Sequence, residues 1–176
     1  MTGEASDRRA RVVATDVPRV VAPGDGHFVD LGALATRFLV WAEESGGGFS
    51  LVEHPIPPRT LAAPLHRHTN EDEYSFVLEG RLGALLGDAV VHASAGELVF
   101  KPRGQWHTFW NAGDTPCRIL EIISPGGFER MFAEMGQDPD AFTGAAAVEL
   151  DARYGLEVDY DSIDRLCQEH GLLFPE

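Results

Sequence analysis

The chain is poor in lysine and has no long apolar run. Lys101 is the only lysine among 14 basic residues, which face 28 acidic ones, so the formal net charge is −14 over 176 residues. Such a charge repels the phosphates of nucleic acids and the surfaces of anionic membranes, so neither is an expected partner. No apolar stretch approaches the length of a bilayer span, which argues against a membrane protein.

Cysteine is equally scarce. Cys117 and Cys167 lie far apart in the sequence, and free thiols in a reducing compartment are expected rather than a disulfide. The segment from Met1 to Arg11 is polar and is followed by no apolar stretch, so we expect no secretory signal. Together these features predict a cytoplasmic location.

Short apolar runs separated by turn signals dominate the middle of the chain. Gly46-Gly47-Gly48 and Gly87-Asp88 are two of these turn signals. Strands are expected at residues 28–31, 36–41, 49–55, 62–68, 73–79, 81–86, 89–92, 97–101, 107–111 and 118–123. Many short strands at even spacing favour an all-β sandwich or barrel.

After Ser124-Pro125 the apolar period changes to that of a helix. Phe128, Met131, Phe132 and Met135 follow the i, i+3, i+4, i+7 pattern of one helix face. A second helix is expected at residues 162–170, and the alanine-rich stretch 141–154 is an ambiguous third. We therefore expect an N-terminal arm (1–26) able to add an edge strand, a barrel (27–125) and a C-terminal helical extension (126–176) packed on the barrel in the same domain.

Four side chains in the barrel region predict a metal site. His66 and His68 lie two apart, so a strand points both imidazoles to one face, and Glu73 follows after a polar turn. Farther along, Pro102 and Gly104 favour a sharp reversal that aims His107 back into the barrel. Three imidazoles and a carboxylate with one coordination position open are typical of a catalytic site for one divalent transition metal, of which Fe, Ni, Mn, Co, Cu and Zn all stay open. The alternative is an inward polar cluster that binds no metal.

These residues resemble the two cupin motifs. The series His66-x-His68-x4-Glu73-x6-Gly80 is similar to the first motif, and Gly96-x5-Pro102-x-Gly104-x2-His107-x3-Asn111 is similar to the second. One position departs, because Thr60 stands where the first motif usually opens with glycine. The resemblance implies a small antiparallel jelly-roll barrel with the metal near its centre, held by His66, His68, Glu73 and His107, and often a homodimer. The stretch from Gly46 to Gly80 further resembles the quercetin 2,3-dioxygenase-like single cupins.

Strand alternation also predicts which residues surround the metal. Under strict alternation several side chains share the inward parity of the ligands, although core packing is an equally good explanation for them. Trp106 is expected at the rim of the cavity, and His54 lies on a strand that can run beside the site. Tyr74, Phe76 and Trp110 face outward, toward the other sheet or a partner subunit. The predicted pocket comprises Ser75, Val77, Phe109, Asn111, Trp106 and His54.

The function that these features favour is a metal-dependent oxygenase acting on a small, oxygen-rich, aromatic or flavonol-like substrate. Glu73 is the expected catalytic residue, as the general base that takes a proton from a substrate enol or phenol. The expected partners are this small molecule and dioxygen. Two alternatives stay open: a sugar or enol isomerase that uses the same metal as a Lewis acid, and a non-catalytic small-molecule-binding protein.

Overall fold

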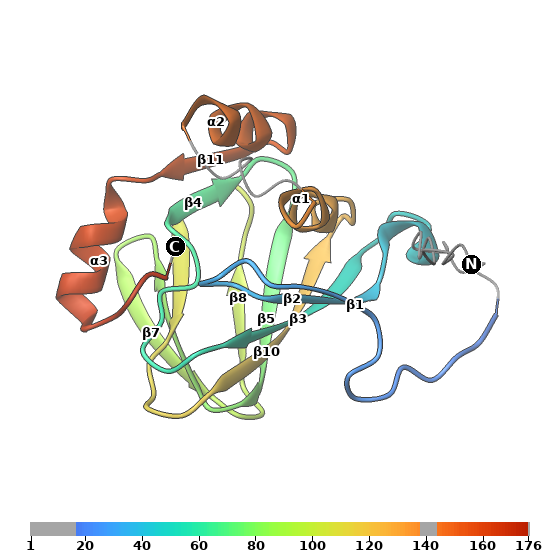
Figure 1. The fold of residues 1–176 in the computed structure, drawn as a ribbon, viewed down its shortest axis with the longest axis horizontal. Coiled ribbons are helices and arrows are strands. Elements are labelled where there is room, and N and C mark those ends of the chain that lie inside the picture. The colour runs from blue at the N-terminus through green and yellow to red at the C-terminus, as the bar shows by residue number, and fades with distance from the viewer. Residues whose placement is uncertain (1–16, 138–143, 176) are drawn as a thin grey trace, which may run out of the picture.

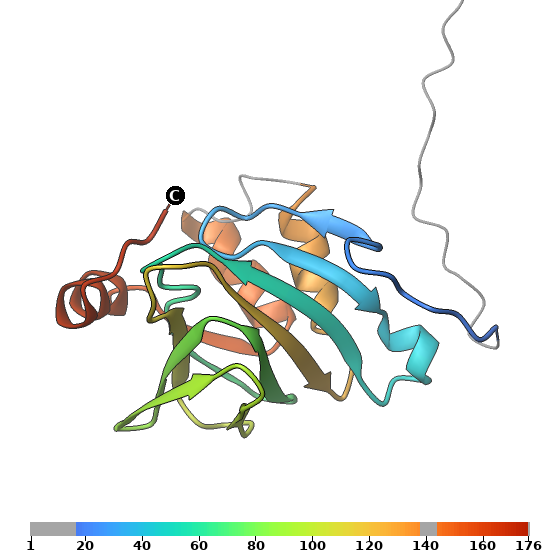
Figure 2. The same cartoon turned by 90° about the horizontal axis from the view of Figure 1, so that it is seen from below.

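The structure, a computed structural model, describes residues 17–137 and 144–175. It consists mostly of two antiparallel sheets with three short helices, which confirms the predicted jelly-roll barrel with a helical C-terminal extension. The two sheets face each other; in Figure 1 two of the helices lie above the sheets and the third lies to their left, and Figure 2 shows the third apart from the other two as well.

Six strands form the first sheet, in the order β1-β2-β3-β10-β5-β8. Strand β8 lies at one end of this sheet, next to β5. The bounds are β1 (His27–Val29), β2 (Thr36–Val40), β3 (Ser50–Ile56), β10 (Cys117–Ser124), β5 (Asp72–Glu79) and β8 (Leu98–Lys101).

Five strands form the second sheet, in the order β11-β4-β9-β6-β7. Strand β4 lies between β11 and β9, so the strand that carries His66 and His68 is paired on both edges. The bounds are β4 (Leu65–His68), β6 (Arg81–Leu86), β7 (Ala89–Ser94), β9 (His107–Asn111) and β11 (Leu156–Asp159).

Strand alternation builds the core. Along β3 and β10 every second residue is buried, as expected of strands with one face on a packed interior. Val77, Phe109 and Ile119 bring three different strands into one apolar cluster, with Ile56 and Leu82 beside them. The strands that carry the predicted ligands are therefore packed on a dense apolar core.

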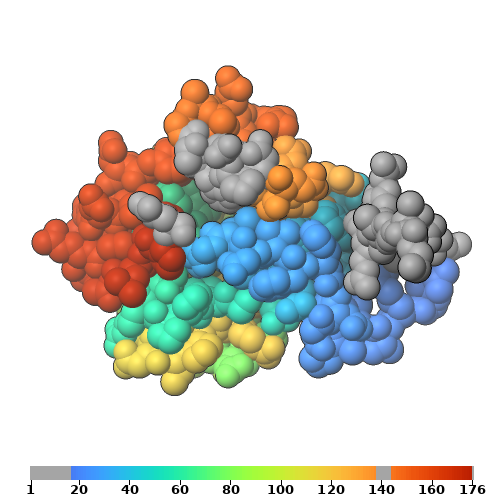
Figure 3. Space-filling model, viewed as in Figure 1, coloured from blue at the N-terminus to red at the C-terminus, as the bar shows by residue number. Residues whose placement is uncertain are grey.

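The C-terminal extension covers the barrel with helices α1 (Glu129–Met135), α2 (Gly144–Arg153) and α3 (Ser162–His170); a short 3-10 turn, η1 (Ala42–Ser45), precedes β3. Phe128 and Phe132 join Val52 in a second apolar cluster. Leu166 of α3 packs on Trp110, whose ring stacks on His170 with centroids 4.4 Å apart. On the face that Figure 3 turns to the viewer, C-terminal residues (orange and red) lie against residues from the N-terminal part of the chain (blue).

One feature of the extension differs from the prediction, and a second is described only in part. Strand β11 was not predicted, and it pairs antiparallel with β4, with His68 opposite Leu156. The alanine-rich helix begins at Gly144 in the structure, and residues 141–143 of the predicted stretch lie outside the described residues, as does the arm up to residue 16. The division into arm, barrel and extension stays a prediction.

None of the helices within residues 17–137 and 144–175 combines the length and the hydropathy needed to cross a bilayer. The cytoplasmic location stays a prediction.

Candidate metal centre

The four predicted ligands come together between the two sheets. His66 and His68 lie on β4, His107 on β9 and Glu73 on β5. His66 is directly opposite His107 in the β4–β9 register, and Glu73 approaches from the other sheet. One ligand atom from each of the four side chains lies within 4.8 Å of the others, and all four side chains are buried. This cluster could hold a metal ion.

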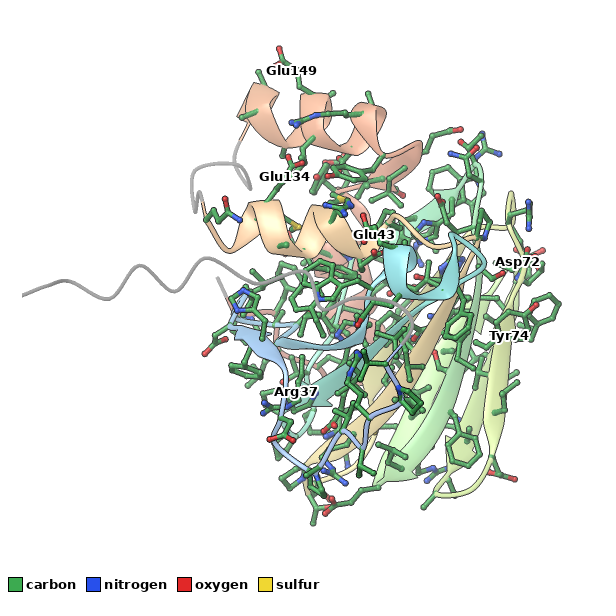
Figure 4. All side chains as sticks on the ribbon, turned by 90° about the vertical axis from the view of Figure 1, so that its right-hand side faces the viewer. Arg37, Glu43, Asp72, Tyr74, Glu134 and Glu149 are labelled. Carbon is green, nitrogen blue, oxygen red and sulfur yellow. The ribbon has the colours of Figure 1, made fainter. Side chains whose placement is uncertain are left out.

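Two turns aim these side chains. Gly104 has a φ of 75°, a left-handed conformation that favours glycine, and its N–H donates to the carbonyl of His68 at 2.7 Å. Arg103 donates from its backbone and from its guanidinium to Asp72, which is labelled at the edge of the barrel in Figure 4. The turn before His107 is thus tied to the turn between His68 and Glu73, and the ligands keep their relative positions.

Backbone carbonyls select the tautomers of two histidines. The Nδ1 atom of His66 lies 2.7 Å from the carbonyl of Pro64, and Nδ1 of His107 lies 3.0 Å from that of Gln105. A carbonyl only accepts, so each Nδ1 carries the hydrogen and each Nε2 presents a lone pair. Nε2 of His107 then faces Oε2 of Glu73 at 3.2 Å, lone pair against carboxylate. A cation between these atoms removes this conflict, and the donor set therefore fits a bound metal.

His68 gives a second test of the fit. Neither of its ring nitrogens makes a hydrogen bond within the part of the chain that the structure describes, although the side chain is buried. Its Nε2 lies 3.4 Å from Oε1 of Glu73. A buried polar atom without a partner costs about 1–3 kcal/mol, and a metal ion at this position would satisfy it.

The buried setting holds the ligands in the protonation state that a metal needs. Burial, with the neighbouring histidines, lowers the pKa of His66 well below its usual value, and burial also lowers the pKa of His107. Burial works to raise the pKa of Glu73, but the positive charge of Lys101 is the largest influence against it, and that pKa lies well below the usual range. Two imidazoles are therefore neutral and the carboxylate is charged near neutral pH, as metal ligands are.

Aromatic rings separate the cluster from water. The Phe128 ring meets the His68 ring edge to face, with centroids 4.3 Å apart, and Phe132 packs against Phe128 at 5.4 Å. Phe128 immediately precedes α1, so the C-terminal extension supplies part of the wall. A water-poor site strengthens each electrostatic interaction within it.

A buried ion network beside the ligands was missed by the sequence prediction. Lys101 is directly opposite Glu73 in the β5–β8 register, and Ser75 is opposite Glu121 in the β5–β10 register. The Lys101 Nζ atom lies 2.9 Å from Oε2 of Glu73 and 3.0 Å from Oε1 of Glu121, while Ser75 donates to Oε2 of Glu121 at 2.7 Å. The signal was present in the sequence, because both charged residues share parity with buried apolar neighbours on their strands.

Three of the predicted pocket residues point into the interior. Ser75, Val77 and Phe109 are all buried. Phe109 lies nearest to the charged network, since its ring centroid is 4.4 Å from the Lys101 Nζ atom. Ser75 is engaged with Glu121, and Val77 belongs to the apolar core. Their contact with a substrate stays a prediction.

Asn111 is fully buried, and its side chain is engaged with the backbone. Its amide donates to the carbonyls of Ile56 and Thr115, and its Oδ1 accepts from the N–H of Gly113. All its polar atoms are therefore bound to backbone, so this side chain stabilises the turn after β9, and its contact with a substrate stays a prediction.

Trp106 and His54 have different surroundings. Trp106 is half-buried, stacks with the Arg67 guanidinium at 5.1 Å and lines a hollow of about 350 Å³ with α2 and β11. His54 is buried, its Nδ1 hydrogen-bonds the carbonyl of Ala35 at 3.0 Å, and its ring is 6.5 Å from that of Phe109. Burial lowers the pKa of His54 to about 4. His54 is thus a buried residue that is neutral near neutral pH, and its contact with a substrate stays a prediction.

Comparison with known proteins agrees with this fold and site. Residues 53–123 match the Cupin domain family, so this region of the chain resembles a single cupin domain. It is 35% identical over 91 residues to the tetracenomycin polyketide synthase protein TcmJ of Streptomyces glaucescens, covering 52% of this chain and 61% of the relative, which is less than two thirds of that protein.

Solved structures show the same fold at low sequence identity. KdgF from Halomonas sp. aligns with a TM-score of 0.57 and 12% identity over 65% of this chain and 99% of its own. A predicted oxalate decarboxylase from Thermotoga maritima aligns with a TM-score of 0.55 and 21% identity over 61% of this chain and 99% of its own. These likenesses concern the fold alone.

Proposed function

We propose that His66, His68, Glu73 and His107 hold one divalent transition metal and that the protein is a metal-dependent oxygenase. Its proposed substrate is a small, oxygen-rich molecule with an enolic or phenolic hydroxyl. The observation that supports this most directly is the orientation of the ligands: two histidines are fixed by backbone carbonyls so that their Nε2 lone pairs point into the cluster. That arrangement is of little use to a core that only has to pack.

The sequence relative is consistent with the proposed substrate class. It carries the name of a polyketide synthase protein, and polyketides are built from repeated ketone units that enolise readily. The quercetin-dioxygenase-like subgroup proposed from the sequence acts on hydroxylated aromatic rings, which present the same kind of acidic hydroxyl. Both point to a substrate that binds as an oxygen anion.

The residues around the cluster have distinct proposed roles. When bound, the metal supplies a Lewis acid that lowers the pKa of a substrate hydroxyl and a centre for chemistry with dioxygen. Glu73, charged near neutral pH, accepts the hydroxyl proton as general base. Phe128, Phe132 and Phe109 keep water away from the reacting atoms.

Oxygen consumption tests the proposal. Protein loaded separately with iron, nickel, cobalt or manganese is mixed with flavonols, catechols and β-diketones in an oxygen-electrode cell, with Glu73→Gln as the matched variant. At least one pairing should consume oxygen, and Glu73→Gln should lose most of this activity. If no combination consumes oxygen, the oxygenase proposal is wrong.

An enol isomerase is the second candidate, and one observation favours it. Glu73 and Lys101 form a buried pair of a base and an acid at 2.9 Å, which suits proton removal and return without dioxygen. Turnover of an enolisable substrate under strict anaerobiosis would support this candidate. Tight binding of such a substrate without turnover, with or without oxygen, would instead indicate a non-catalytic binding protein.

We also propose that the protein is a homodimer that uses the outer face of β5 and β8. Leu98 and Phe100 are about half exposed, and Phe100 stacks on Tyr74, which points away from the barrel in Figure 4. Sedimentation should give twice the mass of one chain, and Phe100→Glu should give a monomer. Val148→Glu, at an exposed apolar residue on α2, should leave the dimer intact, and a monomeric wild type would contradict the proposal.

A further inference from the structure

The only lysine of the chain is buried against a proposed metal ligand. Lys101 is 1% exposed, and its Nζ atom lies between Oε2 of Glu73 and Oε1 of Glu121, at 2.9 and 3.0 Å. A buried ammonium is costly unless it is paired, so the position is maintained by these two carboxylates. Because arginine supplies all the other basic side chains, this one site uses a compact point charge where a guanidinium would be larger.

Glu121 is the second partner of the Lys101 ammonium, and Ser75 in turn holds Glu121. Glu121 projects from β10, in the middle of the six-stranded sheet, and its second oxygen accepts from the Ser75 hydroxyl at 2.7 Å. Both residues are fully or almost fully buried. The ammonium therefore has little freedom to leave Glu73, because its second partner belongs to a rigid strand.

The two oxygens of Glu73 are consequently not equivalent. Oε2 is contacted by the Lys101 Nζ atom and faces Nε2 of His107 at 3.2 Å, whereas Oε1 is directed toward Nε2 of His68 at 3.4 Å. A carboxylate without such a partner can rotate and change the oxygen that it presents. The ion pair removes that freedom before any ligand arrives, which is preorganisation of the site.

We propose that Lys101, held by Glu121, is a positioning residue that fixes the Glu73 carboxylate for metal binding. The inference rests on the metal-binding half of the proposed function and not on the reaction. The direction of the expected change in metal affinity distinguishes this inference from simple electrostatics. A lysine near a cation repels it, so electrostatics alone predicts that removing Lys101 tightens metal binding, whereas loss of positioning weakens it.

A double-mutant cycle in cobalt affinity tests this inference. Co²⁺ is titrated into metal-free wild type, Lys101→Met, Glu73→Gln and the double variant, with the dissociation constant and the visible Co²⁺ absorption spectrum as readouts. Lys101→Met should weaken binding by about 10–100-fold, the range of outer-layer partners of metal ligands. In the Glu73→Gln background the same change should not weaken binding, because the residue on which Lys101 acts is gone and only the repulsion between the ammonium and the cation remains to be removed.

The spectrum separates positioning from a purely structural role. The Co²⁺ spectrum of Lys101→Met should shift toward that of Glu73→Gln, since both lose an oriented carboxylate at the metal. Val99→Ala, a buried change on the same inward face of β8, should leave affinity and spectrum as in wild type. If Lys101→Met fails to fold, Glu121→Gln serves instead, because it keeps the Lys101–Glu73 pair and removes only the second anchor.

Three outcomes would overturn the inference: unchanged or tighter Co²⁺ binding in folded Lys101→Met, an equal loss in both backgrounds, or no effect of Glu121→Gln when it is the variant used. Failure of the proposed function itself appears differently. In that case wild type binds no Co²⁺ at the cluster, and His66→Ala is indistinguishable from it.

Discussion

At the scale of single residues, two carbonyl groups determine the chemistry of the site. The carbonyls of Pro64 and Gln105 each take the Nδ1 hydrogen of a histidine, and this leaves Nε2 of His66 and His107 as metal donors. Each acceptor lies two residues before its histidine, so the tautomer is set by the same local turn that aims the ring. The carbonyl groups that orient these two ligands therefore lie within a few positions of the ligands in the sequence.

Removal of either histidine should abolish metal binding without unfolding the barrel. His66→Ala and His107→Ala each delete one of four donors, so affinity should fall by more than about 100-fold, beyond the loss expected for an outer-layer partner. Elemental analysis of purified protein measures occupancy, and circular dichroism measures the fold. His92→Ala, at an exposed position on β7, is the control and should keep full occupancy. Full occupancy in both ligand variants would show that the ligand assignment is wrong.

His54 should make the protein less stable in mild acid. Burial lowers its pKa from 6.5 to about 4, so between these pH values the unfolded chain binds a proton that the folded chain does not. Stability therefore falls as the pH is lowered through this window, and one such group costs about 3 kcal/mol by pH 4.

The matched variant for this effect is His54→Asn, whose amide can donate to the Ala35 carbonyl but does not titrate in this range. Urea unfolding of metal-free protein at several pH values between 4 and 7 measures the slope of stability against pH. The variant should be less stable at pH 7 because it fills less space, but its slope should be smaller by up to one proton. Equal slopes would mean that His54 does not supply this proton.

At the scale of elements, the contact between β6 and β9 shows how closely the sheet packs. Gly83 on β6 lies opposite Trp110 on β9, and a Cβ at Gly83 would come within 2.3 Å of the indole Nε1. Trp110 cannot easily move away, since it is buried and its ring stacks on His170 of α3. Gly83→Ala should therefore destabilise the protein by about 1–3 kcal/mol, the range of overpacked cores.

The change should also loosen α3 before the rest of the molecule. Hydrogen exchange of the α3 amides should accelerate in Gly83→Ala, because this helix rests on the displaced indole. Gly48→Ala is the control: a Cβ there meets only one atom, at 3.5 Å, so stability and exchange should be as in wild type. Unchanged stability in Gly83→Ala would indicate that the indole is less constrained than its packing suggests.

Sequence analysis succeeded where the information is local. The ligands lie in two short segments with fixed spacing, and strand parity together with the turn at Gly104 is enough to aim them. It failed where a strand pairs with a segment that is far away in the sequence. Strand β11 is four residues long, and only its partner β4, almost ninety positions earlier, makes it a strand.

Sequence analysis missed the buried charged network for a different reason. Lys101 and Glu121 occupy inward positions on β8 and β10, but a charged side chain in a sequence is normally exposed, and that expectation outweighed the alternation. Only the cross-strand register, Glu73 opposite Lys101 and Ser75 opposite Glu121, shows that the charges compensate one another. Asn111 illustrates the same limit, because its partners Ile56 and Thr115 belong to segments that parity does not bring together.

At the scale of the whole molecule, the metal cluster joins the two sheets. Three ligands belong to the five-stranded sheet and Glu73 to the six-stranded one, so the set of four exists only when the sheets are packed together. A metal ion that binds this set binds the folded state and not the unfolded chain. Metal binding should therefore raise the free energy of unfolding of the entire barrel.

The expected size of this effect follows from mass action. Free metal at about 100 times its dissociation constant stabilises the folded state by about 2.7 kcal/mol. For a chain of this length that corresponds to a rise in Tm of about 5–10 °C, measured by thermal unfolding with and without Co²⁺ or Ni²⁺ and reversed by a chelator. The protein has 28 acidic residues and a net charge of −14, so its surface also attracts divalent ions, and His66→Ala separates the two effects. This variant keeps the surface charge but lacks the site, so metal should raise its Tm by little. An equal rise in both proteins would place the stabilising ions on the surface and would contradict a site between the sheets.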